Sequence, residues 1–274
     1  MVAVSTIVYL HAHPDDEASQ TSGQMTLASR AGHRVVVVYA TNGDHGEVPD
    51  DLVPGETLVA RRRGEAQESA TVTGAARVAW LDYADSGMTG WDQNADETCF
   101  HAADLDEAAG RLAAILDEED ADVLVGYDWH GGYGHPDHVK VHRVAHRAAE
   151  LAARRPRLLE STMNRDALRR SAAAAKEAGL EGVMGDFDPD GPMDDGNPMG
   201  LPEDEIHWAV DVSSVVDAKR AALACHRSQK TDIEGFLAIP EDAYALAFGV
   251  EFLAEPGGTG PMRVGWPFGE PTPG

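Results

Sequence analysis

The amino-acid sequence predicts an α/β fold of the Rossmann-like kind, a mostly parallel sheet with helices on both faces and its active site at the carboxyl ends of the strands. Short β-rich runs alternate with helix-compatible stretches along most of the chain. One run, Arg34–Ala40, is almost entirely apolar, as expected of a strand buried on both faces. Two clusters of polar residues directly follow predicted strands. The chain has 274 residues, 43% of them hydrophobic, so it can bury a sizeable core.

The predicted elements alternate in order along the chain. Gly32 breaks the first helical pattern before the apolar strand begins. The expected strands are Ser5–Leu10, Arg34–Ala40, Arg77–Leu81, Ala121–Tyr127, Arg157–Thr162 and His207–Val212. The expected helices are Glu17–Ala31, Thr57–Thr73, Leu105–Glu119, His135–Ala153, Asn164–Ala178 and Val215–Gln229. This alternation indicates a sheet whose strands are joined through helices and therefore run mostly parallel.

Two segments fall outside the alternation. Gly182–Glu205 is rich in Gly, Pro, Met and Asp and is long for a connector, so we expect an irregular loop or a lid. Glu255–Gly274 is rich in Gly and Pro and is expected to be an irregular tail. Because no shift in composition demands a boundary, we expect a single domain over residues 1–274.

Composition restricts the partners of the chain. A formal net charge of −25 repels nucleic acid and anionic membranes, so neither is expected to bind. The two cysteines, Cys99 and Cys225, form neither a disulfide framework nor a Cys-rich zinc pattern, which favours a reducing compartment. The first ten residues lack the basic start of a signal peptide, and no apolar run has the length of a membrane span. We therefore expect a cytoplasmic protein without membrane insertion; a homo-oligomer is compatible with the sequence.

The first polar cluster, YLHAHPDDE, ends the first predicted strand. His13 and Asp16 are three residues apart across a turn stiffened by Pro14, which places both side chains on one side. A histidine nitrogen and a carboxylate oxygen are a suitable pair for zinc. Asp15 would project beside the metal. An alternative interpretation is that Asp15, Asp16 and Glu17 only cap a helix and interact with its dipole.

The second cluster, YDWHGGYGHPDH, leaves a buried strand through a glycine-rich loop and enters a helix. Pro136 suits the first helical position, so His135 would lie near the cap and His138 in the first turn. One of these histidines would complete a His–Asp–His set with the first cluster. Three protein ligands with an open position are typical of catalytic zinc sites.

The remaining residues of the two clusters have roles in such a site. Asp15 is positioned to act as a base on water. The histidine that does not bind metal, His135, could carry a positive charge and stabilise an oxyanion or protonate a leaving amine. Asp137 could hold the imidazole of His135. Tyr133 could donate its hydroxyl to the developing oxyanion.

Other histidines have weaker signals. His142 and His146 continue the stripe of His138 at helical spacing, which fits a metal-binding face or, more simply, supporting or surface positions. His226 lies near a predicted helix end, where it could contact the active site or interact with the helix dipole. His11 could support His13 or make an ordinary buried polar contact.

These motifs resemble the LmbE-like/PIG-L family of zinc-dependent N-deacetylases. His13–Asp16 and His135–His138 match its two metal motifs, in the right order. Thr41–Val48, Arg62–Glu65 and Asp85–Met88 add to the resemblance, which covers roughly the first 150 residues well and the rest weakly.

The resemblance implies one zinc ion held by His13, Asp16 and His138, with Asp15 as the general base. A site of two histidines and a carboxylate also accepts Fe²⁺, Co²⁺ or Mn²⁺. His135 would be the general acid or an electrostatic stabiliser.

The resemblance also implies a substrate. The chain looks most like mycothiol-pathway enzymes that act on N-acetylglucosaminyl-inositol or on mycothiol conjugates. There, Arg62 and Asp85 would contact sugar hydroxyls, Asp137 would orient the acid histidine and Tyr133 would assist at the oxyanion. The expected activity is removal of an N-acetyl group from such an amino-sugar substrate.

Several alternatives stay open. Trp129 and His130 depart from the family pattern, so a mycothiol S-conjugate amidase or a deacetylase of an antibiotic-linked, lipid-linked or chito-oligosaccharide glucosaminide is compatible with the sequence. A sugar-binding protein that has lost catalysis is disfavoured because Asp15 and His135 are intact. A two-metal phosphoesterase is disfavoured because its additional carboxylate ligands are missing.

Overall fold

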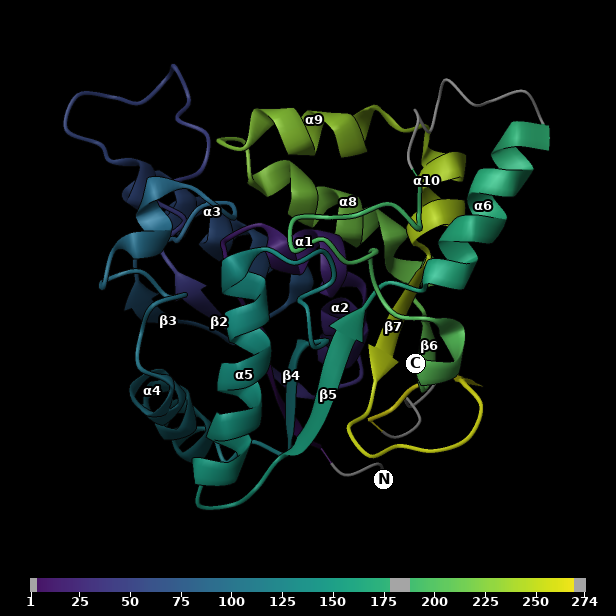
Figure 1. Cartoon of the computed structure of the whole chain (residues 1–274), viewed down its shortest axis with the longest axis horizontal. Helices are drawn as coiled ribbons and strands as arrows, with labels where there is room; N and C mark the ends of the chain where they lie inside the picture. Colours follow the sequence, from purple (N-terminus) through teal and green to yellow (C-terminus); the bar gives the residue numbers. More distant parts are fainter. Residues whose placement is uncertain (1–3, 178–187, 269–274) are drawn as a thin grey trace.

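The computed structural model describes residues 4–177 and 188–268. Within them lies one eight-stranded sheet in the order β3-β2-β1-β4-β5-β7-β6-β8, which confirms the predicted α/β class (Figure 1). Neighbouring strands from β3 to β5 are parallel, and β7 alone runs antiparallel to both of its neighbours. The strands are β1 Thr6–His11, β2 Arg34–Thr41, β3 Arg77–Tyr83, β4 Val123–Tyr127, β5 Arg157–Thr162, β6 Trp208–Asp211, β7 Val250–Ala254 and β8 Arg263–Val264.

Helices cover both faces of the sheet and its upper edge (Figure 1). The α-helices are α1 Asp16–Gln20, α2 Ser22–Arg30, α3 Leu58–Thr73, α4 Leu105–Glu118, α5 Pro136–Leu151, α6 Arg165–Glu177, α8 Val216–Cys225, α9 Lys230–Ala238 and α10 Glu241–Phe248. The short 3₁₀ helices are η1 Asp92–Ala95, η2 Glu203–Glu205 and η3 Ser213–Val215. α4 and α5 pack against one face, and α2 and α3 against the other. The described helices include none that is long and apolar enough to cross a membrane.

The apolar run in β2 explains why the sheet is covered twice. Successive side chains of a strand point to opposite faces. Val36 and Val38 pack into the core under α4 and α5, whereas Val35 and Val37 pack into the core under α2 and α3. All four valines are fully buried. The continuous apolar pattern therefore reflects two cores.

Side-chain caps fix the starts of two helices. Thr57 precedes α3, and its hydroxyl accepts a hydrogen bond from the backbone N–H of Ala60. Asp104 precedes α4 and accepts from the N–H of Glu107 in the same way. Each cap satisfies one of the free N–H groups of a first turn, so these boundaries follow from the local sequence.

The first predicted helix, Glu17–Ala31, was wrong as one element. The backbone of Thr21 leaves the helical region with φ −134°, and α1 and α2 meet there. The Thr21 hydroxyl lies 2.9 Å from Nε2 of His11, a buried partner on β1. This tertiary contact accompanies a break that helical periodicity does not reveal.

The region after the predicted helix Val215–Gln229 also differs from expectation. That helix ends at Cys225, and α9, α10 and β7 follow without having been predicted. In the stretch 243–254 the apolar residues of α10 run almost directly into those of β7, with Gly249 between them. A nearly continuous apolar stretch conceals the change from helix to strand.

The structure describes parts of the two segments expected to be irregular. Residues 182–187 of the expected loop or lid lie outside the described residues. Residues 188–205 contain turns, bends, the short helix η2 and an isolated bridge between Leu201 and Asn164. The tail is irregular between 255 and 268 apart from β8, which pairs with β6. Phe268 is buried against the core, and 269–274 lie outside the described residues.

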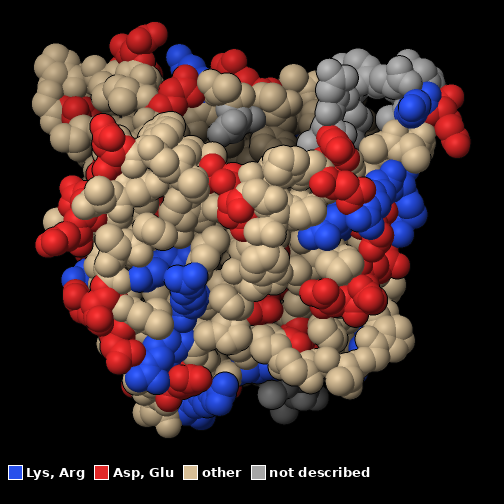
Figure 2. Space-filling model, viewed as in Figure 1, with Lys and Arg blue, Asp and Glu red and all other residues tan. Residues whose placement is uncertain are grey.

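Carboxylates are spread across the surface shown in Figure 2, in keeping with the net charge of −25. Basic side chains on this face gather in two bands, over α5 and over α6. In α6, Arg169 pairs with both Asp166 and Asp190. Its positive charge is thus offset by neighbouring carboxylates.

Candidate active site

The two polar clusters meet at one edge of the sheet. β1 and β4 are parallel neighbours, so their carboxyl ends place the segments that follow them side by side. The turn 12–15 and the first turn of α1 come from β1, and the loop 128–135 and the start of α5 come from β4. The sequence-based expectation that both clusters lie at the carboxyl edge is confirmed.

His138 is oriented by a glycine loop. Pro136 occupies the first turn of α5, and His138 follows in the same turn, fully buried. Nδ1 of His138 lies 3.0 Å from the carbonyl oxygen of Gly131 and can donate to it. That bond leaves the lone pair on Nε2, which lies 3.2 Å from Oδ1 of Asp16.

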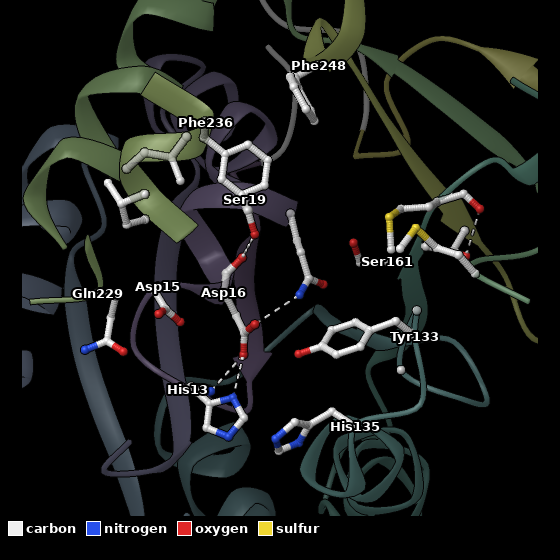
Figure 3. A pocket seen from close by; sticks show the side chains of 18 of the residues that line it. His13, Asp15, Asp16, Ser19, Tyr133, His135, Ser161, Gln229, Phe236 and Phe248 are labelled. Carbon is white, nitrogen blue, oxygen red and sulfur yellow. Dashed lines mark hydrogen bonds and ion pairs between the residues drawn. The ribbon is translucent and has the colours of Figure 1, made fainter. Parts of the chain in front are cut away.

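His13 is held from the opposite side. Its Nε2 lies 3.3 Å from the Asp137 carboxylate and 3.4 Å from that of Asp85. Its Nδ1 lies 3.4 Å from Oδ2 of Asp16 (Figure 3). A proton on Nε2 leaves the Nδ1 lone pair facing Asp16, so one carboxylate stands between two histidine lone pairs.

This donor set fits a divalent transition metal. Ring nitrogens of His13, His135 and His138 all lie within 4.8 Å of one another. Nε2 of His138 is buried and has no hydrogen-bond partner in the described chain. Burial would raise the pKa of Asp16, but His138 and His13 hold it well below its usual value. An ionised carboxylate between imidazole lone pairs has the ligand chemistry of zinc sites.

Asp15 lies beside this set in a strained backbone conformation. Its φ is 126°, which a non-glycine residue adopts only at an energetic cost of about 1–3 kcal/mol. Burial raises the pKa of Asp15 to about 6, against the opposing effect of Arg62. Figure 3 shows the carboxylate facing the cavity close to Asp16. A carboxylate with this pKa is suited to general-base chemistry near neutral pH.

Arg62 fixes Asp15. One guanidinium nitrogen donates to Oδ2 of Asp15 at 2.9 Å and also to the carbonyl oxygen of Pro14. A second nitrogen donates to the carbonyl oxygen of Gly43 at 2.8 Å. Arg62 is buried and lines the cavity. The residue expected only to contact sugar therefore also holds the candidate base.

The sequence allows a contact between His226 and the active site but does not reveal the buried network behind Asp15 that makes this contact. Glu17 accepts hydrogen bonds from the N–H of Asp15 at 3.0 Å and from the hydroxyl of Ser69. Nε2 of His226 lies 2.7 Å from Glu17. Burial would raise the pKa of Glu17, but His226 lowers it to about 2. His226 thus reaches the site through Glu17. Of the two roles that the sequence left open for His226, this is the contact with the active site and not the interaction with a helix dipole.

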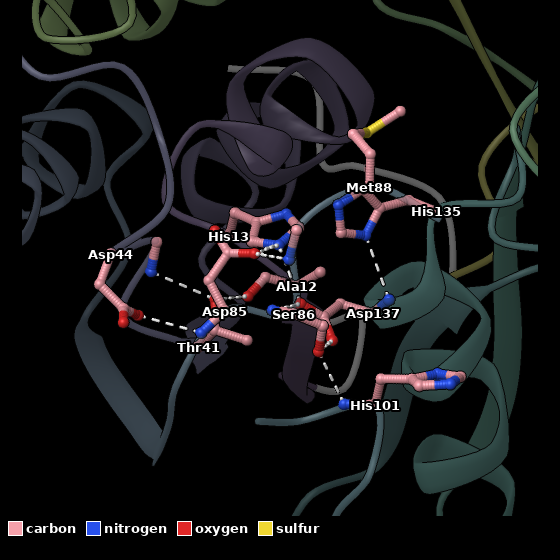
Figure 4. A network of polar contacts seen from close by, with 12 residues as sticks. Ala12, His13, Thr41, Asp44, Asp85, Ser86, Met88, His101, His135 and Asp137 are labelled. Carbon is pink, nitrogen blue, oxygen red and sulfur yellow. Dashed lines mark hydrogen bonds and ion pairs between the residues drawn. The ribbon is translucent and has the colours of Figure 1, made fainter. Parts of the chain in front are cut away.

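The expected partner of Asp137 was wrong. Its carboxylate accepts from the backbone N–H of Ser86 at 2.9 Å and from the Ser86 hydroxyl, and it lies against His13 (Figure 4). His135 is held by the backbone of Asp137, whose N–H donates to Nδ1 at 3.1 Å. A side chain within the first turn of α5 points across to the β1 loop, which spacing alone does not reveal.

His135 is a neutral donor in this environment. Burial and the neighbouring His13 and His138 lower the pKa of His135 to about 2, which differs from the positive charge expected from the sequence. Because Nδ1 accepts from Asp137, the ring proton lies on Nε2. Tyr133 packs near it, with ring centroids 6.2 Å apart, and its hydroxyl points into the cavity (Figure 3).

The site forms the floor of a cavity of about 850 Å³. Asp85 lines it next to His13 and accepts from the N–H of Gly87 at 2.8 Å. Burial would raise the pKa of Asp85, but His13 holds it well below its usual value. The outer wall is apolar, with Phe236 from α9 and Phe248 from α10 (Figure 3). These helices were not predicted, so neither was this wall.

The other histidines considered in the sequence lie outside the cavity floor. His11 makes ordinary buried contacts: Nδ1 lies 2.9 Å from the Tyr127 hydroxyl, and Nε2 is bonded to Thr21. His142 and His146 lie further along α5 and face Glu160 of β5.

Replacing Gly131 with alanine is expected to destabilise the fold and displace His138. Gly131 has φ +64°, and a Cβ there would lie 2.2 Å from Cβ of His138. The left-handed backbone alone costs an alanine about 1–2 kcal/mol, and the clash adds to this. Urea unfolding should show the loss, and metal content should fall.

Gly110 provides the matched control. It lies within α4, and a Cβ there meets nothing within 4 Å. Gly110→Ala should stabilise the protein by about 0.5–1 kcal/mol through helix propensity. Equal stability of the two variants would contradict the assigned role of Gly131.

Comparisons with known proteins agree with this geometry. Residues 8–149 match the family described as PIG-L, GlcNAc-PI de-N-acetylase. A 1D-myo-inositol 2-acetamido-2-deoxy-alpha-D-glucopyranoside deacetylase of Thermobispora bispora is 34% identical over 96% of this chain and 92% of its own length. A deacetylase of the same name from a Nocardioides species is 34% identical over 90% of each chain.

Solved structures show the same fold at lower identity. The N,N'-diacetylchitobiose deacetylase of Pyrococcus horikoshii is 23% identical with a TM-score of 0.57, covering 92% of this chain and 82% of the other. The antimicrobial reagent A40926 pseudoaglycone deacetylase is 15% identical with a TM-score of 0.60, covering 92% of this chain and 96% of the other. At these identities the likeness concerns the fold.

Proposed function

The chain belongs to the GlcNAc-PI de-N-acetylase (PIG-L) family, and on that premise we propose that it hydrolyses the N-acetyl group of 1D-myo-inositol 2-acetamido-2-deoxy-alpha-D-glucopyranoside. It is an enzyme that hydrolyses an N-acetyl amide. The observation that supports the substrate most is the likeness to deacetylases of that name over almost the whole chain. The observation that supports the chemistry is the half-buried Asp15, with its raised pKa, beside a set of metal-binding donors.

We assign His13, Asp16 and His138 as the ligands of one divalent ion, and we expect this ion to be zinc. Asp16 lies between the lone pairs of the two histidines, at 3.4 and 3.2 Å. When bound, such an ion supplies Lewis acidity that polarises the amide carbonyl and makes water more acidic near neutral pH. The hydrogen bonds to Gly131 and Asp137 set the tautomers that present both lone pairs.

Asp15 takes the proton of the attacking water. Its Oδ2 is engaged by Arg62, which leaves Oδ1 for the water. The water oxygen bonds to the acetyl carbon as Asp15 receives the proton. When the C–N bond breaks, the protonated Asp15 can return this proton to the amine nitrogen, so that acetic acid and a free glucosamine amine are formed. At neutral pH the acid then ionises to acetate and the amine takes up the proton. A pKa of about 6 suits a group that must both accept and release a proton.

His135 and Tyr133 are assigned to the developing oxyanion. The N–H on Nε2 of neutral His135 and the Tyr133 hydroxyl both face the cavity (Figure 3). Preorganised donors of this kind stabilise negative charge on the former carbonyl oxygen. Asp137 acts by holding His13 through its carboxylate and His135 through its backbone N–H.

We retain Arg62 and Asp85 as substrate-binding residues. Both line the cavity beside the reacting centre, and both carry charge that can bind sugar hydroxyls. Arg62 also contacts Asp15, and Asp85 also contacts His13. A sugar bound by Arg62 and Asp85 would therefore be positioned by residues that also hold the base Asp15 and the metal ligand His13.

A larger amide, such as that of a mycothiol S-conjugate, is the second candidate. The apolar outer wall with Phe236 and Phe248 favours it, because inositol and glucosamine have few apolar groups to place there. Acetate release from the inositol glycoside and amide cleavage of a conjugate, measured on the same metal-loaded sample, separate the two candidates.

The deciding experiment measures acetate released from a small panel of N-acetylglucosaminides. We expect the highest kcat/KM for the inositol glycoside, with loss of activity on chelation and recovery on adding Zn²⁺. Metal-loaded protein that releases acetate from no member of the panel would contradict the proposal. Preference for a chito-oligosaccharide would preserve the chemistry and overturn the substrate.

A further inference from the structure

A second group of metal-binding side chains lies outside the cavity. His142 and His146 follow His138 on α5, one and two turns later, and Glu160 lies on the adjacent strand β5. One carboxylate oxygen, Oε1 of Glu160, lies 3.1 Å from Nδ1 of His142 and 2.7 Å from Nε2 of His146. The two imidazole rings are 4.4 Å apart between centroids. One donor atom from each residue falls within 4.8 Å of the others.

One histidine of this cluster is also hydrogen-bonded to the backbone, as metal-binding histidines often are. Nδ1 of His142 also lies 3.1 Å from the carbonyl oxygen of Tyr127, on β4. This contact with a backbone carbonyl fixes the orientation of the His142 ring next to Glu160, as such hydrogen bonds do for metal-binding histidines. The ligand set therefore comes from a helix and a strand that are fixed independently.

The negative charge of Glu160 can interact with a bound cation. In the described chain, the ion pairs of Glu160 are with the two histidines and involve no lysine or arginine. The side chains of His142, His146 and Glu160 are 21%, 37% and 13% exposed, so an ion from solvent can reach them.

We propose that His142, His146 and Glu160 form an accessory site for a late first-row divalent metal such as Zn²⁺, Co²⁺ or Ni²⁺, separate from the catalytic site. Two imidazole nitrogens and one carboxylate oxygen suit these ions, whereas Mg²⁺ and Ca²⁺ prefer oxygen ligands alone. Binding displaces the proton that His146 shares with Glu160 and leaves the remaining coordination positions to water. This site ties the middle of α5 to β5, so the bound ion stabilises the native state by linkage.

The test uses the holoenzyme with its catalytic metal in place and Ni²⁺ as the added probe. Equilibrium dialysis followed by elemental analysis should give one catalytic metal and one nickel per wild-type chain. The Tm should rise with the concentration of Ni²⁺. His146→Gln and Glu160→Gln should each abolish the nickel uptake and the Tm shift, while acetate release stays at the wild-type level.

His101→Gln is the matched control. His101 is an exposed histidine whose backbone donates to the Ser86 hydroxyl and accepts from Lys140, so the His101→Gln variant should keep the nickel uptake of the wild type. A wild-type chain that takes up no nickel, or uptake that survives both His146→Gln and Glu160→Gln, would overturn the proposal. Neither result depends on which amide the enzyme hydrolyses.

Discussion

Asp15→Asn is expected to lower kcat for acetate release by about 10²–10⁴-fold, the usual contribution of a positioned general base. Asparagine keeps the size of the side chain and can still accept a hydrogen bond from Arg62, but it cannot take a proton from water. Because Asp15 lies beside the proposed metal ligands, the variant should retain one catalytic metal per chain. Steady-state kinetics with elemental analysis of the same sample measures both quantities.

Asp106→Asn controls for the loss of a carboxylate. Asp106 is an exposed residue of α4 that pairs with Arg147, and exposed pairs contribute at most about 1 kcal/mol. This variant should keep wild-type kinetics. Unchanged kcat in Asp15→Asn would show that another group deprotonates the water, and loss of the metal would show that Asp15 is itself a ligand.

His138→Ala is expected to remove the catalytic metal and reduce activity by at least about 10³-fold, since both the Lewis acid and the activated water depend on the ion. His138 is buried and its Nε2 faces Oδ1 of Asp16 at 3.2 Å, so a solvent-exposed side chain cannot easily replace it. Activity of the chelated wild type should return when Zn²⁺ is added, whereas the variant should not recover.

The metal count in this experiment is best made in a His146→Gln background, which removes the proposed accessory site. The parent His146→Gln protein should hold one zinc, and the double variant should hold none. A double variant with one zinc and full activity would exclude His138 as a ligand.

The metal-ligand candidates could be predicted because their geometry is local. His13 and Asp16 share a turn, and His138 lies in the first turn of a helix that begins with proline. The alternation of strands and helices then placed both segments at the same edge of the sheet. Which histidine of the second motif presents its lone pair to Asp16 depends on the carbonyl of Gly131, and sequence spacing does not reveal this contact.

The supporting contacts could not be predicted because they join distant parts of the chain. Ser86 binds Asp137 across 51 positions, and His226 binds Glu17 across 209. The sequence points to the segment of Ser86 and to His226, but it does not reveal which side chain either of them contacts. The low pKa of His135 likewise arises from burial and two neighbouring imidazoles, which exist only in the folded protein.

In the fold, too, elements determined by the local sequence were predicted, and elements that depend on distant contacts were missed. The strands β1 and β5 are short β-rich runs next to helix-compatible stretches, and both were predicted within one residue. β7 was missed because its identity as a strand depends on pairing with β5 and β6 rather than on an alternating pattern. The neighbouring helix α10 was missed together with β7. Because α10 supplies part of the apolar wall of the cavity, that wall was not predicted either.

Anomalous diffraction at the zinc absorption edge, from crystals grown with Zn²⁺, tests directly whether two remote segments share one ion. We expect a peak bounded by Nδ1 of His13, the carboxylate of Asp16 and Nε2 of His138, at about 2.0–2.2 Å from each ligand atom. A zinc-saturated crystal with no peak among these three side chains would contradict the proposed metal site and the mechanism that depends on it.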